Sequence, residues 1–186
     1  SAVNSIACGS GIVVAACSGG SGHNNIIYSD SYSGNVLGKV WNTSSTNIFG
    51  SSNLFSVVYN GNVWVASAMD SKIFWSADGV AWDKGTFSVD GQSTVWYTLG
   101  SLLQANSSMT QDINIMSVSW NGSEFLAKAG YFGMGGSATT VTDVTSQDGI
   151  SWTLPNNVQA WEDTTQKDRK STRLNSSHSS VSRMPS

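Results

Sequence analysis

Two stretches of the chain, Ser76-Ala-Asp78-Gly79-Val-Ala-Trp82 and Ser146-Gln-Asp148-Gly149-Ile-Ser-Trp152, share the pattern Ser-x-Asp-Gly-x-x-Trp. A motif that returns at the same point of two longer units indicates a repeat architecture. Asp in such a position accepts hydrogen bonds from backbone N–H groups just ahead of it, and Gly can adopt a left-handed conformation. Each stretch is therefore predicted to be a turn between two strands, with the Trp starting the outgoing strand.

The repeat extends upstream of the motif. Three segments align without gaps, at residues 5–17, 56–68 and 117–129. Asn60-Gly61 and Asn121-Gly122 lie between apolar runs in the second and third segments. Because Asn-Gly favours the two positive φ angles of a type I′ turn, each segment is predicted to be a β-hairpin.

A further strand is expected after each hairpin, so that each unit has four short antiparallel strands. These third strands are Asn25–Tyr28, Lys72–Trp75 and Val141–Thr145. The first unit carries the motif in a degraded form. Ser29-Asp30-Ser31 is in place, but Trp41 follows several residues late, after Gly34 and Gly38.

The pattern Ser-x-Asp-Gly-x-x-Trp resembles the Asp-box, or BNR repeat, of sialidase-like β-propellers. In that family the Asp-box joins the third and fourth strands of a blade and lies away from the catalytic face. The resemblance implies an all-β fold, a partial β-propeller of about three four-stranded antiparallel blades, with units near 5–45, 55–87 and 115–155. It implies a structural role for the residues of the two motifs, which are Ser76, Asp78, Gly79, Trp82, Ser146, Asp148, Gly149 and Trp152.

The last residues of the chain differ from the rest. The string that begins Asp168-Arg-Lys-Ser-Thr-Arg and the final Ser182-Arg-Met-Pro-Ser186 resemble the translation of a short-read sequencing adapter. We therefore expect 168–186 to be an artefactual disordered tail and 1–167 to be an incomplete propeller, cut at both ends. The alternative is a genuine basic, disordered tail.

Charge narrows the range of partners. The whole chain has a formal net charge of −3, and 168–186 holds four basic residues against one acidic, which leaves −6 for the remainder. That remainder has no Arg, which disfavours nucleic-acid binding, and no apolar run approaches the length of a membrane span. We predict a glycan or a protein as partner, no nucleic acid, no membrane segment in this sequence and no cofactor. An extracellular or cell-surface location is favoured.

Catalytic chemistry has little support in these residues. Sialidases of the family use an arginine triad, a Tyr–Glu nucleophile pair and an Asp acid, and residues 1–167 contain no Arg. Glycoside hydrolysis needs two carboxylates that face one sugar, and no such constellation is recognisable. His23 has no ligand partners at metal-binding spacing. We predict a non-catalytic binding or scaffold β-propeller, with no catalytic, cofactor or metal residues. The alternative is a sialidase-like glycoside hydrolase whose active residues lie in other blades.

Four further residues carry separate predictions. Trp96 and Trp161 lie outside the aligned repeats and could stack on a sugar ring or a partner, the alternative being a place in the core. Cys8 and Cys17 are expected to be two buried thiols rather than a disulfide.

The insert 88–114 contains Thr94–Leu99, which could be an outermost or innermost strand of the next blade. The insert as a whole is either a binding loop or a tolerated insertion.

Overall fold

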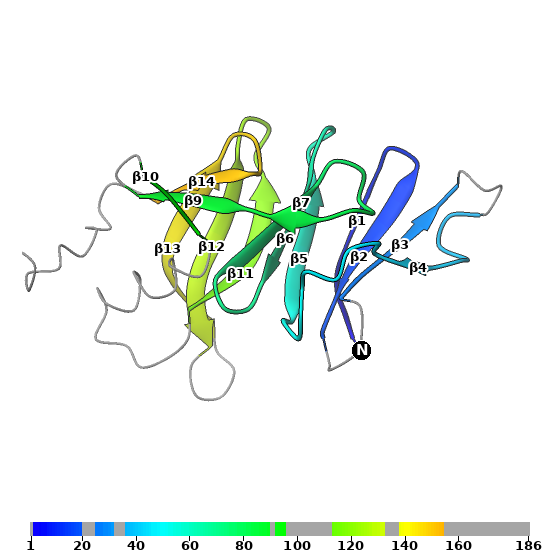
Figure 1. The fold of residues 1–186 in the computed structure, drawn as a ribbon, viewed down its shortest axis with the longest axis horizontal. Helices are drawn as coiled ribbons and strands as arrows, with labels where there is room; N and C mark the ends of the chain where they lie inside the picture. Colours follow the sequence, from blue (N-terminus) through cyan, green and yellow to red (C-terminus); the bar gives the residue numbers. More distant parts are fainter. Residues whose placement is uncertain are drawn as a thin grey trace, which may run out of the picture.

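The computed structural model describes residues 2–19, 25–31, 36–89, 92–95, 113–132 and 138–154. Regular secondary structure in these ranges consists of β-strands, so the all-β prediction is confirmed. The strands form three sheets that lie side by side in chain order, from the first sheet in blue to the third in yellow (Figure 1). The predicted hairpins are the first two strands of the first and second sheets and a neighbouring pair in the third.

The first and second sheets each have four antiparallel strands that follow the order of the chain. The strands of the first sheet are β1 (Val3–Gly9), β2 (Ile12–Cys17), β3 (Ile26–Asp30) and β4 (Asn42–Thr43). The strands of the second sheet are β5 (Leu54–Tyr59), β6 (Trp64–Ala68), β7 (Lys72–Ser76) and β8 (Asp83–Lys84).

The third sheet differs from the four-stranded antiparallel prediction, because it has six strands in the order β10-β9-β14-β13-β12-β11. Its strands are β9 (Thr86–Val89), β10 (Gln92–Val95), β11 (Asn114–Trp120), β12 (Phe125–Phe132), β13 (Ala138–Ser146) and β14 (Ser151–Thr153). After β8 the chain runs on into β9, which pairs in parallel with β14. This pairing covers the backbone groups that a short edge strand would otherwise expose.

Strand β10 forms a hairpin with β9 and lies at the outer edge of the third sheet. It includes the first two residues of the predicted strand Thr94–Leu99. The sequence left open whether this strand is the outermost or the innermost of its blade. Thr94 and Val95, the part of it that the structure describes, lie in the outermost strand.

The hairpin turns correct one prediction. In the turn between β5 and β6 only Gly61 has a positive φ, of 104°, and in the turn between β11 and β12 only Gly122 does, at 101°, whereas a type I′ turn needs two such residues. Asn60 instead precedes the turn, and its Oδ1 accepts the N–H groups of Asn62 and Val63 at 2.9 and 2.8 Å. The first hairpin has the I′ pattern, with positive φ at both Ser10 and Gly11.

A β-bulge recurs at the same place in the first strand of every predicted hairpin. The register shifts between Val3 and Ser5 in β1, and at the equivalent steps in β5 and β11. The serine after the bulge then reaches the next sheet. Ser5 Oγ accepts the Val57 N–H at 3.2 Å, and Ser56 Oγ donates to the Val118 carbonyl at 3.1 Å. The two junctions between sheets are thus built in the same way.

The second sheet is buried on both faces. Alternate residues of β6 divide between two core clusters, with Trp64 facing the first sheet and Val65 the third. Both side chains are 0% exposed. Burial of apolar surface on this scale is the main stabilising term for the stack of sheets.

The prediction of two buried thiols is wrong for Cys8. Cys17 is buried, but Cys8 is exposed, and both are free. Cys8 pairs with Val13 across the hairpin and Cys17 with Val3, so the two thiols are not opposite each other. Cys8 is equivalent to Tyr59 of the second sheet, whose ring lies against Gly9 of the first. No sheet of the described residues lies in the corresponding place beside Cys8.

Candidate functional site

The Ser–Asp turns, Ser76–Trp82 and Ser146–Trp152, have the same hydrogen bonds. Asp78 Oδ1 accepts the N–H groups of Val80 and Ala81, each at 2.8 Å. Asp148 Oδ1 accepts two backbone N–H groups at the same distances in the other turn. The serine Oγ accepts the glycine N–H at 2.8 Å in both turns. Each carboxylate is therefore engaged by the backbone of its own turn.

The same contacts set the electrostatics of the two carboxylates. Partial burial by itself raises the pKa of Asp78, but the N–H groups of Ala81 and Val80 and the Ser76 hydroxyl outweigh it, so that the pKa is lowered. The pKa of Asp148 is lowered by the equivalent donors against the same opposing effect of burial. Both groups are thus held ionised, which suits hydrogen-bond acceptors and does not suit a general acid near neutral pH.

The glycines of the Ser–Asp turns lie between neighbouring sheets. A Cβ on Gly79 would be 3.0 Å from Val14 Cγ2 of the first sheet, and one on Gly149 would be 2.7 Å from Val65 Cγ2 of the second. The φ angles of these glycines are 76° and 74°. Glycine is required here both by its backbone conformation and by the close approach of the preceding sheet.

The tryptophans close the Ser–Asp turns. Trp82 Nε1 donates to Gly79 O at 3.1 Å, and Trp152 Nε1 donates to Gly149 O at 3.2 Å. Trp82 is 3% exposed and Trp152 is 0% exposed. Each indole is thereby buried with its N–H satisfied, as a core Trp requires.

The first sheet contains a third version of this turn, in which the motif is interrupted. Ser29 Oγ accepts the Gly38 N–H at 2.8 Å, and Trp41 Nε1 donates to Gly38 O at 2.9 Å. Gly38 has a φ of 83°. It is therefore the counterpart of Gly79 and Gly149, and Leu37 stands in the place of the aspartate.

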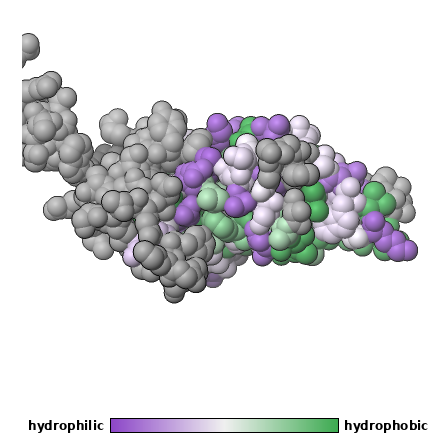
Figure 2. Space-filling view, turned by 90° about the horizontal axis from the view of Figure 1, so that it is seen from below, coloured by the Kyte–Doolittle hydropathy of each residue, from purple (hydrophilic) through white to green (hydrophobic). Residues whose placement is uncertain are grey.

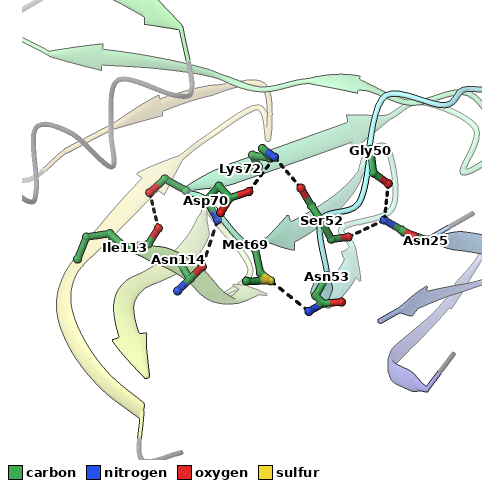
Figure 3. Close-up of polar contacts among 10 residues, drawn as sticks. Asn25, Gly50, Ser52, Asn53, Met69, Asp70, Lys72, Ile113 and Asn114 are labelled. Carbon is green, nitrogen blue, oxygen red and sulfur yellow. Dashed lines mark hydrogen bonds and ion pairs between the residues drawn. The ribbon is translucent and has the colours of Figure 1, made fainter. Parts of the chain in front are cut away.

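At the opposite end of the sheets lies a polar junction, which we define as Asn25, Ser52, Asp70, Lys72 and Asn114 (Figure 3). Lys72 Nζ donates to Ser52 Oγ at 2.6 Å and forms an ion pair with Asp70 at 3.0 Å. The Asp70 side chain is 53% exposed, whereas that of Lys72 is 18% exposed. The junction thus presents a carboxylate to solvent above a lysine that is mostly covered.

The turn that carries Asp70 is held by the third sheet. Asp70 and Ser71 both have left-handed backbones, with φ of 58° and 57°, a conformation that costs about 1–2 kcal/mol for a residue with a side chain. Asn114 Oδ1 accepts the Asp70 N–H at 3.1 Å, and Ser71 Oγ donates to Ile113 O at 2.8 Å. These bonds stabilise the turn and fix the position of Asp70.

Asn25 joins the first sheet to the junction. It is 0% exposed, and its Nδ2 donates to the carbonyl of Ser52 at 2.5 Å. Its Oδ1 is buried, and no donor among the described residues pairs with it. Because Asn25, Ser52 and Asn114 are buried, the group that the junction offers to a ligand is the exposed carboxylate of Asp70, an acceptor for hydroxyl, amide or cationic groups.

Sequence reasoning singled out the Ser–Asp turns but missed the polar junction. A signal for it exists, because an Asn precedes the hairpin serine by three residues in two units, as Asn53 before Ser56 and Asn114 before Ser117. The two other candidates, Trp96 and Trp161, lie outside the described residues.

Metal and membrane features were also sought in the described parts of the chain. Within those ranges, no group of three or more His, Cys, Asp or Glu side chains is arranged to hold a metal ion. The same residues include no helix with the length and apolar character that a bilayer crossing requires.

Comparison with known proteins assigns no family. No family model matches the chain, and no curated protein matches it. Among solved structures, it is similar to the computationally designed Ika8 protein, with 12% sequence identity and a TM-score of 0.40. The alignment covers 82% of this chain and 45% of the designed one, so this chain spans less than half of that protein's length.

Proposed function

We propose that this chain is a non-catalytic portion of a β-propeller, whose sheets are its blades, and that it binds a glycan or a protein at the end that carries the polar junction. The observation that supports a structural rather than a catalytic role for the motif is the repetition of the Ser–Asp turns. In both aspartates one carboxylate oxygen accepts hydrogen bonds from two backbone N–H groups of its own turn. A catalytic carboxylate is not expected at two equivalent positions of a repeat.

The repeated construction of the stack supports the blade assignment. The hairpin serines of the first two units, Ser5 and Ser56, bond to the next sheet, and each glycine of a Ser–Asp turn fits against the preceding sheet. Equivalent contacts between successive units are what a propeller or another repeat architecture uses to bury its core.

The location of binding is argued from the polar junction. Its exposed Asp70 stands on a strained turn of the second sheet that Asn114 of the third sheet and the adjacent Ile113 hold in place. Backbone strain of this kind concentrates at sites where a side chain must be held in one position. The Ser–Asp turns, by contrast, place their glycines and tryptophans in the packing between sheets.

A glycan array probed with the purified chain tests this proposal, with Asp70→Asn as the site variant. Asp143→Asn is a matched control, because Asp143 is similarly exposed, at 49%, and pairs with Lys128 at 3.3 Å. We expect Asp70→Asn to weaken binding to any captured glycan by about tenfold, which corresponds to the loss of one charge-assisted contact. Asp143→Asn should leave binding unchanged.

Two outcomes would contradict the proposal. Equal loss of binding in the two variants would remove the junction as the site. Turnover of a fluorogenic sialoside or of another aryl glycoside by the chain would show that it is a hydrolase and not a binding module.

A further inference from the structure

The large hydrophobic side chains that are exposed among the described residues all lie in the first sheet or in its turn. They are Val3, Ile6, Val36, Leu37, Val40 and Trp41. Hydrophobic residues, in green, reach the surface toward the end of the molecule that carries the first sheet (Figure 2). An exposed apolar patch of this kind usually marks an interaction surface.

Comparison of Ile6 with its repeat counterparts shows what covers this position elsewhere. Ile6 is 56% exposed, whereas the equivalent Val57 and Val118 are 5% and 6% exposed. The backbone of Val57 is bonded by Ser5 of the preceding sheet, and that of Val118 by Ser56 of its own preceding sheet. Val57 and Val118 are thus each buried by the preceding sheet of the same repeat.

Trp41 gives the same result. It is 38% exposed, against 3% for Trp82 and 0% for Trp152. The buried indoles pack with a phenylalanine that follows the fourth strand of the preceding unit. Phe49 lies 6.1 Å from Trp82 between ring centroids, and Phe87 shares a core cluster with Trp152.

The space beside Gly38 is open, whereas a preceding sheet occupies the equivalent space beside Gly79 and Gly149. A Cβ on Gly38 would have no atom within 4 Å. Its counterparts Gly79 and Gly149 are in tight contact with apolar side chains of the second strand of the preceding sheet, such as Val14 and Val65. Within the described ranges, Ile6, Gly38 and Trp41 of the first unit therefore lack the contact that their counterparts make with a preceding sheet.

The third sheet of a second copy does not match this surface. Positions 16 and 67, which face the next sheet, hold the buried residues Ala16 and Ser67, but the third sheet has Lys128 there. Lys128 forms an ion pair with Asp143, and the two side chains are 57% and 49% exposed. Packing the first sheet against this pair would desolvate two charges, which is unfavourable.

We infer that the rear face of the first sheet, which carries Ile6, Cys8, Gly38 and Trp41, is the docking surface for a further β-sheet of this repeat. That sheet carries a serine equivalent to Ser5, two apolar residues on its second strand, and an aromatic residue after its fourth strand. The surface is an interface between repeat units, distinct from the polar junction, and does not depend on the proposed ligand.

The test adds such a sheet to the full chain. Because Asn53 and Ala2 occupy equivalent positions, a second copy of residues 1–52 joined directly before Ala2 places a repeat unit with Ser5, Ile12, Val14 and Phe49 in front of the first sheet. The added copy carries Cys8→Ser and Cys17→Ala. The original Cys8, which is exposed in the present structure, then reports on docking, and the buried Cys17 is an internal control.

We expect the rate at which Cys8 reacts with a thiol reagent to fall by about tenfold or more in the extended chain, since access governs thiol reactivity. Ile6→Lys in the original first sheet should restore the rate. Asn62→Lys, at an exposed hairpin tip, should not. Circular dichroism of the unextended Ile6→Lys chain checks that this variant folds.

Either of two results would overturn the inference. One is a Cys8 rate in the folded extended chain within about twofold of that in the unextended chain, with Cys17 unreactive in both. The other is protection of Cys8 in the unextended chain that rises with protein concentration together with a dimeric mass, because the face would then pair with a second copy of itself.

Discussion

Gly149 and Val65 belong to different sheets and approach so closely that a Cβ on Gly149 would lie 2.7 Å from Val65 Cγ2. The same arrangement occurs at both Ser–Asp turns: the turn of one sheet packs against the second strand of the preceding sheet. The approach at Gly149 is closer than the 3.0 Å at Gly79. Val63 Cγ1 lies equally close to the same position, at 2.7 Å. The stack therefore has no space for a larger residue at this point.

Gly149→Ala should destabilise the chain strongly. The substitution places a side chain on a left-handed residue and into an occupied space, for a combined loss of about 2–4 kcal/mol in the free energy of unfolding. Denaturant unfolding followed by Trp fluorescence measures this change. Gly122→Ala is the control, because Gly122 also has a positive φ, of 101°, but no atom near a Cβ. It should lose about 1–2 kcal/mol, and equal losses in the two variants would mean that the contact between sheets contributes nothing.

The tryptophans of the turns should differ in their importance. Trp152→Ala removes a side chain that is 0% exposed and leaves a cavity between two sheets, with an expected loss of about 3–5 kcal/mol. Trp41→Ala removes the equivalent indole where it is 38% exposed and should cost about 1 kcal/mol. The midpoints of urea unfolding of the two variants give the comparison. A larger loss for Trp41 would indicate that the first sheet is packed differently.

Acid should weaken the Ser–Asp turns. Both aspartates have a folded-state pKa below the ordinary value of 3.8. Their contribution to stability is therefore present at pH values above 3.8 and is lost as the pH falls through the lower folded-state pKa. In the double variant Asp78→Asn, Asp148→Asn this loss should disappear, so that its unfolding midpoint between about pH 4 and pH 2 falls less steeply than that of the parent. Identical slopes would show that these carboxylates do not contribute.

The two cysteines should react at different rates. Cys8 is exposed, whereas Cys17 is buried and its pKa is raised by that burial. A colorimetric thiol reagent should modify one thiol rapidly in the native chain and the second only after denaturant is added. The rapid phase should be absent in Cys8→Ser and retained in Cys17→Ala. Rapid modification of both thiols in the native chain would contradict the burial of Cys17.

Local chemistry explains why some elements of the fold were predictable. The hairpins, the strands after them and the Ser–Asp turns depend on residues close together in the sequence, such as Asn60 with Gly61 and Asp78 with Gly79. The type I′ turn predicted for the second hairpin was wrong. The Asn60 side chain accepts two backbone N–H groups, and Gly61 is the one residue of this turn with a positive φ. The Asn-Gly pair alone does not distinguish these two arrangements.

The polar junction depends on residues that are far apart in the chain. Asp70 meets Asn114, and Asn25 meets Ser52, only because three sheets bring their ends together. The parallel pairing of β9 with β14 is likewise a contact between distant segments. No local pattern specifies such contacts, since they require the register and stacking of whole sheets.

The sequence alone determined an all-β chain of repeated hairpins with a shared turn motif, because turn residues and alternating apolar residues act over short distances. Tertiary structure decided which surfaces those hairpins bury. It placed Gly149 against Val65, shielded Cys17 and left Cys8 exposed. It also left Ile6 and Trp41 uncovered on the first sheet, while the equivalent positions of the later sheets are buried. Burial depends on which sheet stands next to which, and this is a property of the assembled stack.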